Sequence, residues 1–473
     1  MLASLTPCLR QSSETGVPAS CSLNMPMICS SVKRLRFILW SSQMGQSLLQ
    51  NGLFQRGKVK SALLKRAFLE DREMDVPCVW LQPDALLNVQ LDTRPTDQFV
   101  QRISVWKKGM LREILGAFFD KATLGQVSEL DTASADSLAE IIVKWLDQKG
   151  GKDGKPRFLN IYIDDIDRGW KANPEDITNI SALLNAIRDL GGKYPRIRFR
   201  IGLRSDVYFL VRTSDESTDK IESNVIWLRW INDDILRVMA KRIATFFRLQ
   251  YSEAAIGNMD QGQITTAILK EVIEPRFSGK GKWENRPVHK ILLSLTRARP
   301  RDLVKLFRLA AKKANRRGSS LITSPDLNGV FEEYSQERLQ DIINEFKSEL
   351  PQIERLLLAM KPNKNERRTA MNYSFTTDQL SKKITRIIQQ NNFTFTNGKS
   401  ISSRSLIQFL YKIDFITAKK ESDDGNVDRK YFEQSRFLGH EIVDFGYSWE
   451  IHPAYRWALQ PENVHNLLDA LDL

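Results

Sequence analysis

The segment at residues 158–168 constrains the fold of this chain more than any other, because an apolar run leads directly into a cluster of acids. It reads Phe-Leu-Asn-Ile-Tyr-Ile-Asp-Asp-Ile-Asp-Arg, and glycines and Pro156 precede it. Such a run is typical of a strand buried on both faces, as in a parallel sheet with helices above and below. Asp164 and Asp165 would then lie at the carboxyl end of that strand, where open α/β sheets bind ligands and a carboxylate can hold Mg²⁺ beside nucleotide phosphates. The alternative is a strand that ends in a solvated acidic turn.

The length of 473 residues predicts several domains, and the content of 42% hydrophobic and 27% charged residues is typical of a folded globular protein. Lys and Arg (70) outnumber Asp and Glu (57), so polyanions are plausible partners. No apolar run approaches the ~20 residues of a membrane-spanning helix, so we expect no membrane association. Four cysteines match neither a disulfide framework nor zinc-ligand spacing, which indicates a reducing, cytoplasmic location. Residues 1–35 are expected to be a disordered or non-native leader.

The periodicity of the next part of the chain, residues 36–231, alternates between helix and strand. Helices are predicted at residues 60–69, 97–120, 137–148 and 175–190, the last beginning at Pro174 and ending at Gly191-Gly192. Strands are predicted at residues 76–81, 158–163, 196–203 and 224–228. Strands that alternate with helices favour a doubly wound parallel sheet.

From residue 232 to residue 360 the pattern is helical, with helices predicted at 233–249, 263–273, 287–295, 302–314 and 325–347. The charged joint Lys-Pro-Asn-Lys-Asn-Glu-Arg-Arg at 361–368 predicts a domain boundary. In the last domain, 361–473, helices at 377–390 and 403–413 precede strands at 415–419 and 447–451, which flank a polar turn at 421–428. Helices followed by a β-hairpin suggest a winged helix.

A phosphate-binding loop should precede the acidic strand, and the candidate is the segment at 56–64. The residues that would contact the nucleotide are Gly57, Lys58, Lys60, Ser61 and Ala62. In this alignment Phe54 and Val59 stand where glycines belong, and a β-branched residue disfavours a positive φ. A shifted alignment from Gly52 to Lys58 restores both glycines but puts Val59 at the hydroxyl position, and the strand expected at 48–54 is weak. An ordinary basic helix start is the alternative.

Two arginines are candidates for sensing the nucleotide. Arg204 follows the strand predicted at 196–203 and could stabilise charge on the γ-phosphate, or it could pair structurally with Asp206 or Asp165. Arg301 lies at the start of the helix predicted at 302–314 and could reach the nucleotide from the helical unit. The alternative for Arg301 is a solvated basic helix.

The predicted winged helix carries the cations that would meet DNA phosphates, which are Arg404, Lys412, Lys419 and Lys420. Acids at the tip of the wing (Glu421, Asp423 and Asp424) oppose DNA. Winged helices also serve protein contacts, so a protein partner or a homo-oligomer remains open beside DNA.

Several motifs together carry a resemblance that covers about residues 50–460. They are Lys-Ser-Ala-Leu-Leu at 60–64, Ile-Tyr-Ile-Asp-Asp-Ile-Asp-Arg at 161–168, Ile-Gly-Leu-Arg-Ser-Asp at 201–206, Trp230, Arg-Pro-Arg-Asp-Leu at 299–303 and Ile-His-Pro at 451–453. The chain resembles a bacterial P-loop ATPase family allied to the signal-transduction and origin-recognition branches of the AAA+ class.

This resemblance implies an α/β fold, with a doubly wound parallel-sheet P-loop NTPase core, an all-α lid and a C-terminal winged-helix domain. It implies ATP and Mg²⁺ as cofactors, with Ser61 and Asp164 on the metal and Asp165 polarising water. Arg204 would be the first sensor and Arg301 the second.

The function that we expect is a regulatory ATPase that hydrolyses ATP slowly to ADP and phosphate and acts as a nucleotide-dependent switch, in a DNA-linked process or in antiphage defence. The rival is a degenerate, nucleotide-free scaffold or DNA-binding protein that keeps the fold.

Overall fold

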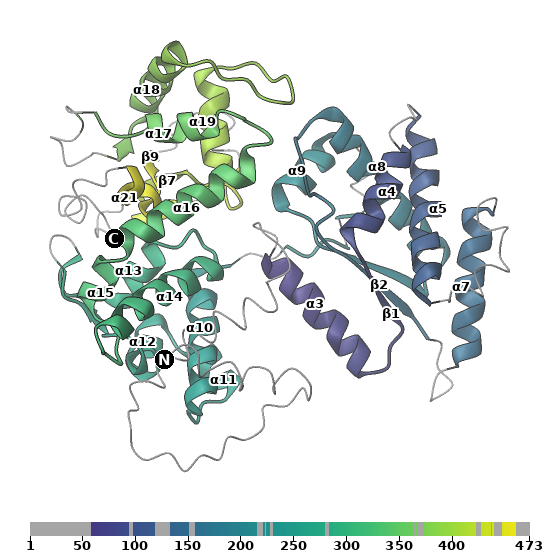
Figure 1. The fold of residues 1–473 in the computed structure, drawn as a ribbon, viewed down its shortest axis with the longest axis horizontal. Helices are drawn as coiled ribbons and strands as arrows, with labels where there is room; N and C mark the ends of the chain where they lie inside the picture. The colour runs from purple at the N-terminus through teal and green to yellow at the C-terminus, as the bar shows by residue number, and fades with distance from the viewer. Residues whose placement is uncertain are drawn as a thin grey trace.

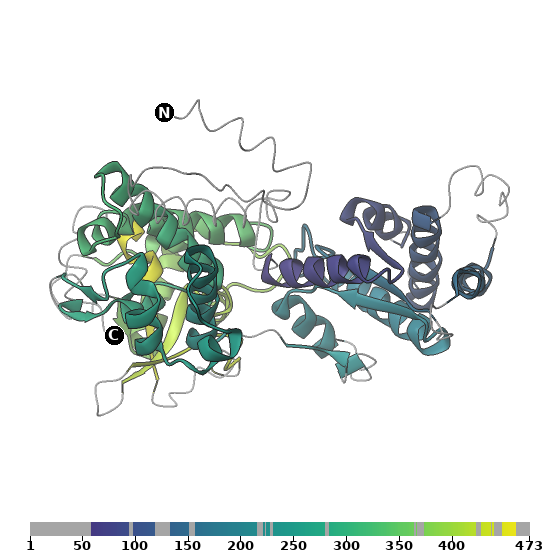
Figure 2. The same cartoon turned by 90° about the horizontal axis from the view of Figure 1, so that it is seen from below.

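A computed structural model describes residues 58–93, 98–118, 133–150, 157–214, 221–222, 224–227, 230–279, 283–363, 366, 373–421, 427–436, 438 and 447–459. They form two bodies, an α/β unit and a mainly helical body (Figures 1 and 2). The leader at 1–35, the strand expected at 48–54, and Gly52, Phe54 and Gly57 lie outside the described residues.

The α/β unit is built on a three-stranded parallel sheet of order β1-β2-β3. Its strands are β1 (Cys78–Leu81), β2 (Leu159–Ile163) and β3 (Ile197–Ile201). All five residues of β2, the predicted acidic strand, are buried, which confirms that its two faces are covered. The six helices described in this unit are α3 (Lys58–Glu73), α4 (Pro83–Thr93), α5 (Phe99–Phe118), α7 (Ala135–Lys149), α8 (Pro174–Lys193) and α9 (Ser205–Ser214).

The two faces of this sheet differ in character. One face, which includes Val79, Ile161 and Ile163, joins a buried apolar cluster with residues of α5 and α8 such as Trp106 and Leu183. This burial of aliphatic surface, worth about 25 cal/mol per Å², anchors the helices on that face.

The opposite face of the sheet is polar and aromatic, and α3 lies across it (Figure 1). Asp71 of α3 accepts hydrogen bonds from Asn160 Nδ2 (2.7 Å) and Tyr162 Oη (2.5 Å). Phe68 of α3 packs edge-on against Trp80 and Tyr162, at centroid distances of 5.7 and 5.5 Å. These contacts fix the direction of α3, and hence the position of its first turn, relative to β2.

The second body holds the remaining helices, which are α10 (Asn232–Phe247), α11 (Glu253–Asn258), α12 (Gln261–Ala267), η2 (Leu269–Glu271), α13 (Val288–Ser294), α14 (Pro300–Arg316), α15 (Ser324–Asn328), α16 (Phe331–Phe346), α17 (Ile353–Ala359), α18 (Thr377–Gln390), α19 (Ser403–Lys412), η5 (Pro453–Tyr455) and α21 (Arg456–Leu459). One buried cluster runs from Ile235 to Leu459, across the boundary expected at 360/361. Trp457 of α21, for example, packs against Phe331 of α16 with ring centroids 4.9 Å apart.

This body also contains short antiparallel strands. β4 (Arg276–Phe277) pairs with β5 (Arg286–Pro287), and a four-stranded sheet has the order β6-β9-β7-β8. Its strands are β6 (Ser374–Phe375), β7 (Ile416–Glu421), β8 (Val427–Lys430) and β9 (Ser448–Ile451). With α18 and α19 it gives two helices and an antiparallel sheet. The strand that follows the polar turn is β8, which was not predicted, and the strand predicted at 447–451 is β9, the other neighbour of β7.

Most predicted elements are present, and several predictions are wrong in detail. The helix predicted at 263–273 is divided into α12 and η2. Residues 224–227 do not form a strand. The helix α8 begins at Pro174 as expected, with Asn173 Oδ1 accepting from the Asp176 amide (2.7 Å), but it runs through Gly191 and Gly192 to Lys193. The long helix predicted at 325–347 is broken at Gly329 into α15 and α16.

Candidate functional site

Asp164 and Ser61, which were predicted to share a metal, lie in contact. Asp164 is buried at the end of β2, and the hydroxyl of Ser61, in the first turn of α3, donates a hydrogen bond to its carboxylate. Gly202, just after β3, closes the site from the side: a Cβ at this position would lie 2.7 Å from Asp164 Oδ1 and 2.8 Å from Leu64 Cδ1. The first turn of α3 and the ends of β2 and β3 therefore converge on one carboxylate.

The start of α3 contains four of the five predicted phosphate-binding residues, Lys58, Lys60, Ser61 and Ala62, and the fifth, Gly57, lies outside the described residues. Lys58, Val59, Lys60 and Ala62 all have helical backbone here, and their side chains lie outside the described part of the chain. A helical Val59 does not need a positive φ, so the steric objection to a β-branched residue at this position does not apply. The start of a helix is also where unpaired backbone amides favour phosphate.

Burial raises the pKa of Asp164 to about 6, although the hydrogen bond from Ser61 works against that rise. The neighbouring charge of Asp165 raises the pKa further, and the backbone amide of Asp165 lowers it. A buried carboxylate that burial and a like charge destabilise is one that a bound cation would stabilise.

Asp165, the residue predicted to polarise water, has a left-handed backbone with a φ of 55°. This conformation is uncommon outside glycine, although Asp tolerates it better than most residues. At this turn 45% of the surface of the Asp165 side chain is exposed. Asp165 is thus accessible while Asp164, one residue earlier, is not.

The structural alternative for Arg204 is confirmed, because Arg204 pairs with Asp206 through Nε (3.1 Å) and Nη2 (2.7 Å). The Arg204 amide also donates to Asp167 Oδ2 (3.2 Å). Burial would lower the pKa of Arg204, but the charge and hydrogen bond of Asp206, together with the charges of Asp167 and Glu345, outweigh it and raise that pKa. Arg204 is therefore a buried, permanently charged group whose guanidinium is engaged by carboxylates.

Arg204 and Asp206 belong to an alternating arrangement of charges that joins the two bodies, which we call the interface charge cluster: Arg204, Asp206, Glu349 and Lys412. Lys412 of α19 lies 2.8 Å from Glu349 and 3.6 Å from Asp206. Arg204 Nη2 lies 3.7 Å from Glu349 Oε1. Each cation thus approaches one carboxylate of its own body and one of the other body.

Other contacts reinforce the same interface at the carboxyl end of the sheet. Ser348 Oγ donates to the carbonyl of Trp170, in the loop after β2, at 2.8 Å. Arg436 lies over the rings of Phe209 (4.3 Å) and Trp227 (4.9 Å). The edge that holds Asp164 therefore faces the helical body.

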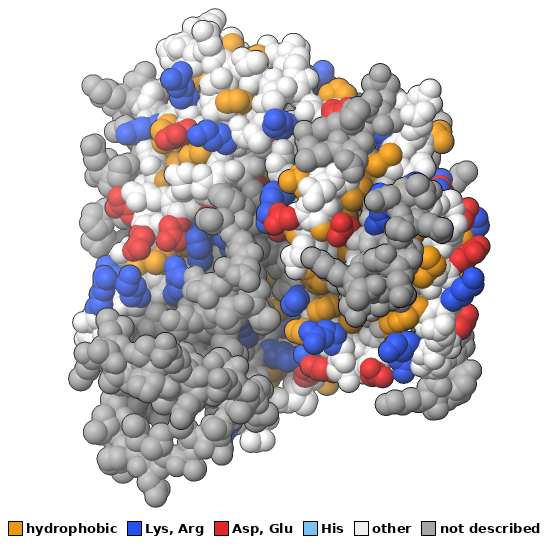
Figure 3. All heavy atoms as spheres, turned by 45° about the vertical axis from the view of Figure 1, so that its right-hand side comes forward, with side chains coloured by type: hydrophobic (Ala, Val, Ile, Leu, Met, Phe, Trp, Pro, Cys, Tyr) orange, Lys and Arg blue, Asp and Glu red, His pale blue; other side chains and the backbone are white. Residues whose placement is uncertain are grey.

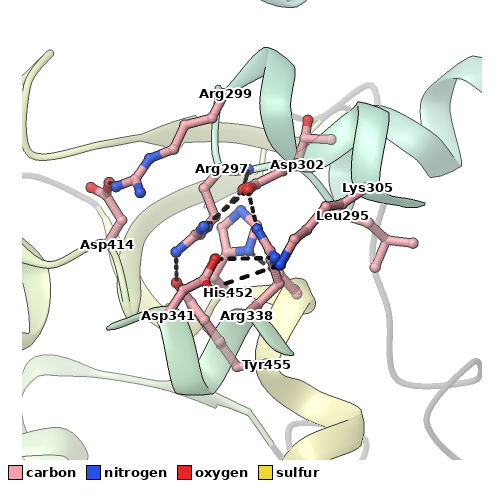
Figure 4. A network of polar contacts seen from close by, with 12 residues as sticks. Leu295, Arg297, Arg299, Asp302, Lys305, Arg338, Asp341, Asp414, His452 and Tyr455 are labelled. Atoms are coloured by element: carbon pink, nitrogen blue, oxygen red, sulfur yellow. Dashed lines mark hydrogen bonds and ion pairs between the residues drawn. The ribbon is translucent and has the colours of Figure 1, made fainter. Parts of the chain in front are cut away.

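Arg301, the predicted second sensor, is half-buried in the first turn of α14, and burial lowers its pKa. Among the described residues, no ion pair or hydrogen bond joins Arg301 to Asp164, Asp165 or Ser61. Its neighbour Asp302 is instead the centre of a buried network (Figure 4). Arg297 binds Asp302 through Nε (2.7 Å) and Nη2 (3.0 Å).

This network ties α14 to the C-terminal segments. Arg338 Nη1 of α16 also reaches Asp302, at 2.7 Å, and Arg297 Nη1 donates to Tyr455 Oη at 3.0 Å (Figure 4). Arg299 Nη2 lies 3.1 Å from Asp414. Arg297 and the Arg-Pro-Arg-Asp motif thus fasten α14 to the segments around Asp414 and Tyr455.

The four cations expected to meet DNA separate into two pairs. Lys412 lies in the interface charge cluster, and Lys419 is buried. Arg404 and Lys420 are exposed. The two acids at the wing tip, Asp423 and Asp424, lie outside the described residues, as does the side chain of Glu421.

Two features of this site were not predicted from the sequence. The Ile-Gly-Leu-Arg motif gave no reason to single out Gly202, although a glycine directly after a strand marks a close approach of other atoms. Glu349, in the turn after α16, and Lys412, at the end of α19, were not linked to Arg204.

The donor set at this site suits Mg²⁺, which takes one or two protein oxygens and retains water. Ser61 and Asp164 supply a hydroxyl and a carboxylate. Over the described residues, no group of three or more His, Cys, Asp or Glu side chains is placed to hold a metal. Nor does any helix in that part of the chain have the length and apolar character to cross a membrane.

Comparison with known proteins finds two similarities. Residues 263–343 match the family model of a FunZ-associated C-terminal helical domain, which corresponds to the region from α12 to α16. A protein of Escherichia coli (strain K12), named "Putative transposon gamma-delta 80.3 kDa protein", is 24% identical over 339 residues. The alignment covers 67% of this chain and 43% of that relative, so the chain spans less than half of the relative's length.

Proposed function

We propose that this chain is a nucleotide-dependent switch that binds ATP with Mg²⁺ at the carboxyl ends of β2 and β3. The observation that carries the proposal is the hydrogen bond between Ser61 and Asp164, which joins the first turn of α3 to the end of β2. A hydroxyl at a helix start and a carboxylate after a strand are the protein ligands of Mg²⁺ in P-loop NTPases. The raised pKa of Asp164 supports a cation there.

We assign a role to each residue of the site from whether its side chain is buried or exposed. The bound cation would neutralise charge on the phosphates. Ser61 and Asp164 would hold it, and Lys60 would add positive charge at the helix start. Asp165, which is accessible, would orient a water molecule. Slow hydrolysis is in keeping with an Arg204 that carboxylates already neutralise, because little of its charge is left for a transition state.

Coupling to the rest of the molecule is proposed through the interface charge cluster. Arg204 follows β3 directly, so a shift at the carboxyl end of the sheet moves a charge that also contacts Glu349. Nucleotide binding would then change the balance of ion pairs across the interface. A ligand shifts such an equilibrium only by its difference in affinity for the two states.

The second candidate is a nucleotide-free scaffold that binds duplex DNA. Two observations favour it: the transposon in the name of the Escherichia coli relative, and the exposed cations Arg404 of α19 and Lys420 of β7. Binding through phosphates would weaken steeply as salt rises. A flat salt response would instead favour a protein partner or a second copy of the chain.

Calorimetric titration with ATP, with and without Mg²⁺, tests the first proposal. Wild type should bind ATP saturably, and Mg²⁺ should strengthen binding by about tenfold or more, which corresponds to about 1.4 kcal/mol. Asp164→Asn should abolish the effect of Mg²⁺, and Lys60→Ala should weaken binding with Mg²⁺ and without it. Asp378→Asn, on the exposed side of α18, is the matched control and should behave as wild type.

Absence of saturable ATP binding to a folded wild-type protein would end the switch proposal and leave the scaffold. If Mg²⁺ still strengthened ATP binding in Asp164→Asn as it does in wild type, Asp164 at the end of β2 would not be a ligand of the metal.

A further inference from the structure

A second concave site lies away from the proposed nucleotide site. It is a cavity of about 530 Å³ along the outer edge of β1, toward the end of the sheet where the strands begin. Residues of the helices α3 and α7 line it, and so does Arg157, just before β2. We call it the β1 groove. Its volume lies within the usual range for ligand sites, about 300–1,000 Å³.

Three aromatic rings line the β1 groove: Phe68, Trp80 and Trp145. Each is only partly buried. Trp80 stacks on Tyr162 with an interplanar angle of 5°, and Trp145 packs on Phe118 with centroids 4.6 Å apart. Lys65 Nζ also lies 4.9 Å from the ring centroid of Phe68 and 5.0 Å from that of Trp80, and part of the surface of each ring remains open. Flat rings in fixed orientations are platforms on which bases stack, at about 1–3 kcal/mol per base.

Cations accompany these rings. Lys149 lies 5.9 Å from the ring centroid of Trp145, and Arg72 lies 5.9 Å from that of Phe68. Arg157 is the third lining cation. The one acid among the lining residues, Asp75, pairs with Arg157 at 3.3 Å, so the lining carries a net positive charge.

Another cation lies over an aromatic ring beside the β1 groove. Arg198 of β3 is exposed and lies over the ring of Phe158 at 3.5 Å. Its partner across the sheet is Asn160, which in turn pairs with Cys78 at the groove, so the two sites are about 10 Å apart at the usual strand spacing. Over the α/β unit, Figure 3 shows exposed hydrophobic side chains among Lys and Arg side chains, with Asp and Glu side chains between them.

We propose that the β1 groove binds single-stranded nucleic acid, with bases stacked on Trp80 and Trp145 and phosphates against Arg72, Lys149 and Arg157. Charge complementarity selects a polyanion, and the partly open rings select unpaired bases over a duplex. The proposal does not rest on nucleotide binding at Asp164, because the two sites lie at opposite ends of the sheet.

The test is fluorescence anisotropy with labelled 15-residue dT and rU strands and the full chain. Wild type should bind at least one of the two strands, with an affinity that falls steeply between 50 and 200 mM salt. Arg72→Gln combined with Lys149→Gln should weaken binding about tenfold or more and make the salt dependence shallower. Trp145→Ala should weaken it at every salt concentration, because stacking does not depend on counterions.

The matched control is Lys312→Gln combined with Arg316→Gln, which removes the same charge from exposed positions of α14. It should bind as wild type does. If the control variant lost as much affinity for the strands as the groove variant, the loss would be due to net charge alone, which would overturn the proposal. So would failure to bind either strand, equal affinity for a duplex of the same length, or equally effective competition by polyglutamate, which would point to an acidic peptide.

Discussion

At the scale of single residues, the proposed nucleotide site depends on one position without a side chain. Gly202 lets β3 end close to Asp164 and Leu64, and any Cβ there would meet both. Asp165 has a left-handed backbone conformation, which is uncommon outside glycine, and its carboxylate is exposed. Strained conformations of this kind persist where the surrounding structure fixes them, and they gather at functional sites.

Gly202→Ala should lower the free energy of unfolding by about 1–3 kcal/mol, because the new methyl group forces Asp164 or Leu64 to move. It should also weaken any Mg²⁺-dependent ATP binding, since Asp164 would lose its position beside Ser61. Urea denaturation and calorimetry measure the two effects. Gly192→Ala is the control, because a Cβ there meets no atom within 4 Å and α8 is helical; it should be neutral or stabilising by up to about 1 kcal/mol. A Gly202→Ala protein as stable as wild type would contradict the tight packing.

At the scale of helices and strands, the sequence predicts the elements that can be recognised from the spacing of apolar residues within the element itself. The run from Leu159 to Ile163 is a strand because it is apolar and bounded, and α14 and α18 follow from their spacing of apolar residues. The two-residue strand β6 could not be predicted, since Ser374 pairs with Glu450, far along the chain. The apolar residues at 224–228 looked like a strand, but Trp227 instead packs against Tyr208 and Arg436.

The same limit applies to the candidate site. Asp164 with Ser61, and Arg204 with Asp206, were foreseeable because each lies in a motif of known geometry. The contacts of Glu349 and Lys412 could not be foreseen, because the sequence around each residue does not indicate which distant residue it will contact. Whether Arg301 acts as a sensor stays a prediction.

The turn at 451–455 should make the fold sensitive to acid through His452. Its Nδ1 accepts from the Ala454 amide (3.1 Å), and its Nε2 lies 3.1 Å from Tyr431 Oη. Burial lowers the pKa of His452 to about 3, whereas the unfolded chain has an ordinary value near 6.5. Its contribution to stability is therefore complete above about pH 6.5, and between pH 6.5 and pH 3 it falls by about 1.4 kcal/mol per pH unit.

Urea denaturation at pH 7.5, 6.0 and 5.0 tests this for wild type and His452→Gln. The variant should be less stable at pH 7.5, and the difference between the two proteins should shrink as the pH falls. A difference that stays constant over this range would show that His452 is not held neutral by the fold.

At the scale of the whole molecule, the two bodies meet where the sheet presents its carboxyl ends. Two cations and two carboxylates alternate there, so the interface charge cluster carries no net charge. The four charges compensate one another as long as all are present, but removal of one of them leaves a buried charge without its partner, which destabilises the fold.

Lys412→Met should therefore cost about 3–5 kcal/mol of stability or docking and favour separation of the bodies. Small-angle scattering should show a larger radius of gyration, and limited proteolysis should become faster. Adding Glu349→Gln should restore much of the loss, because the uncompensated carboxylate is gone. Lys312→Met, at an exposed position of α14, should leave both measurements unchanged. If the double variant is as open as Lys412→Met, the charges do not hold the interface.

The continuous core of the helical body has a consequence during synthesis. The α/β unit closes its core between Val79 and Val211, whereas the other body needs Trp457 to complete its own. At common rates of translation, the chain between these points takes on the order of tens of seconds to emerge. For that interval the nascent α/β unit carries Arg204 and Asp206 without the ion pairs to Glu349 and Lys412, which form only once the helical body has been made.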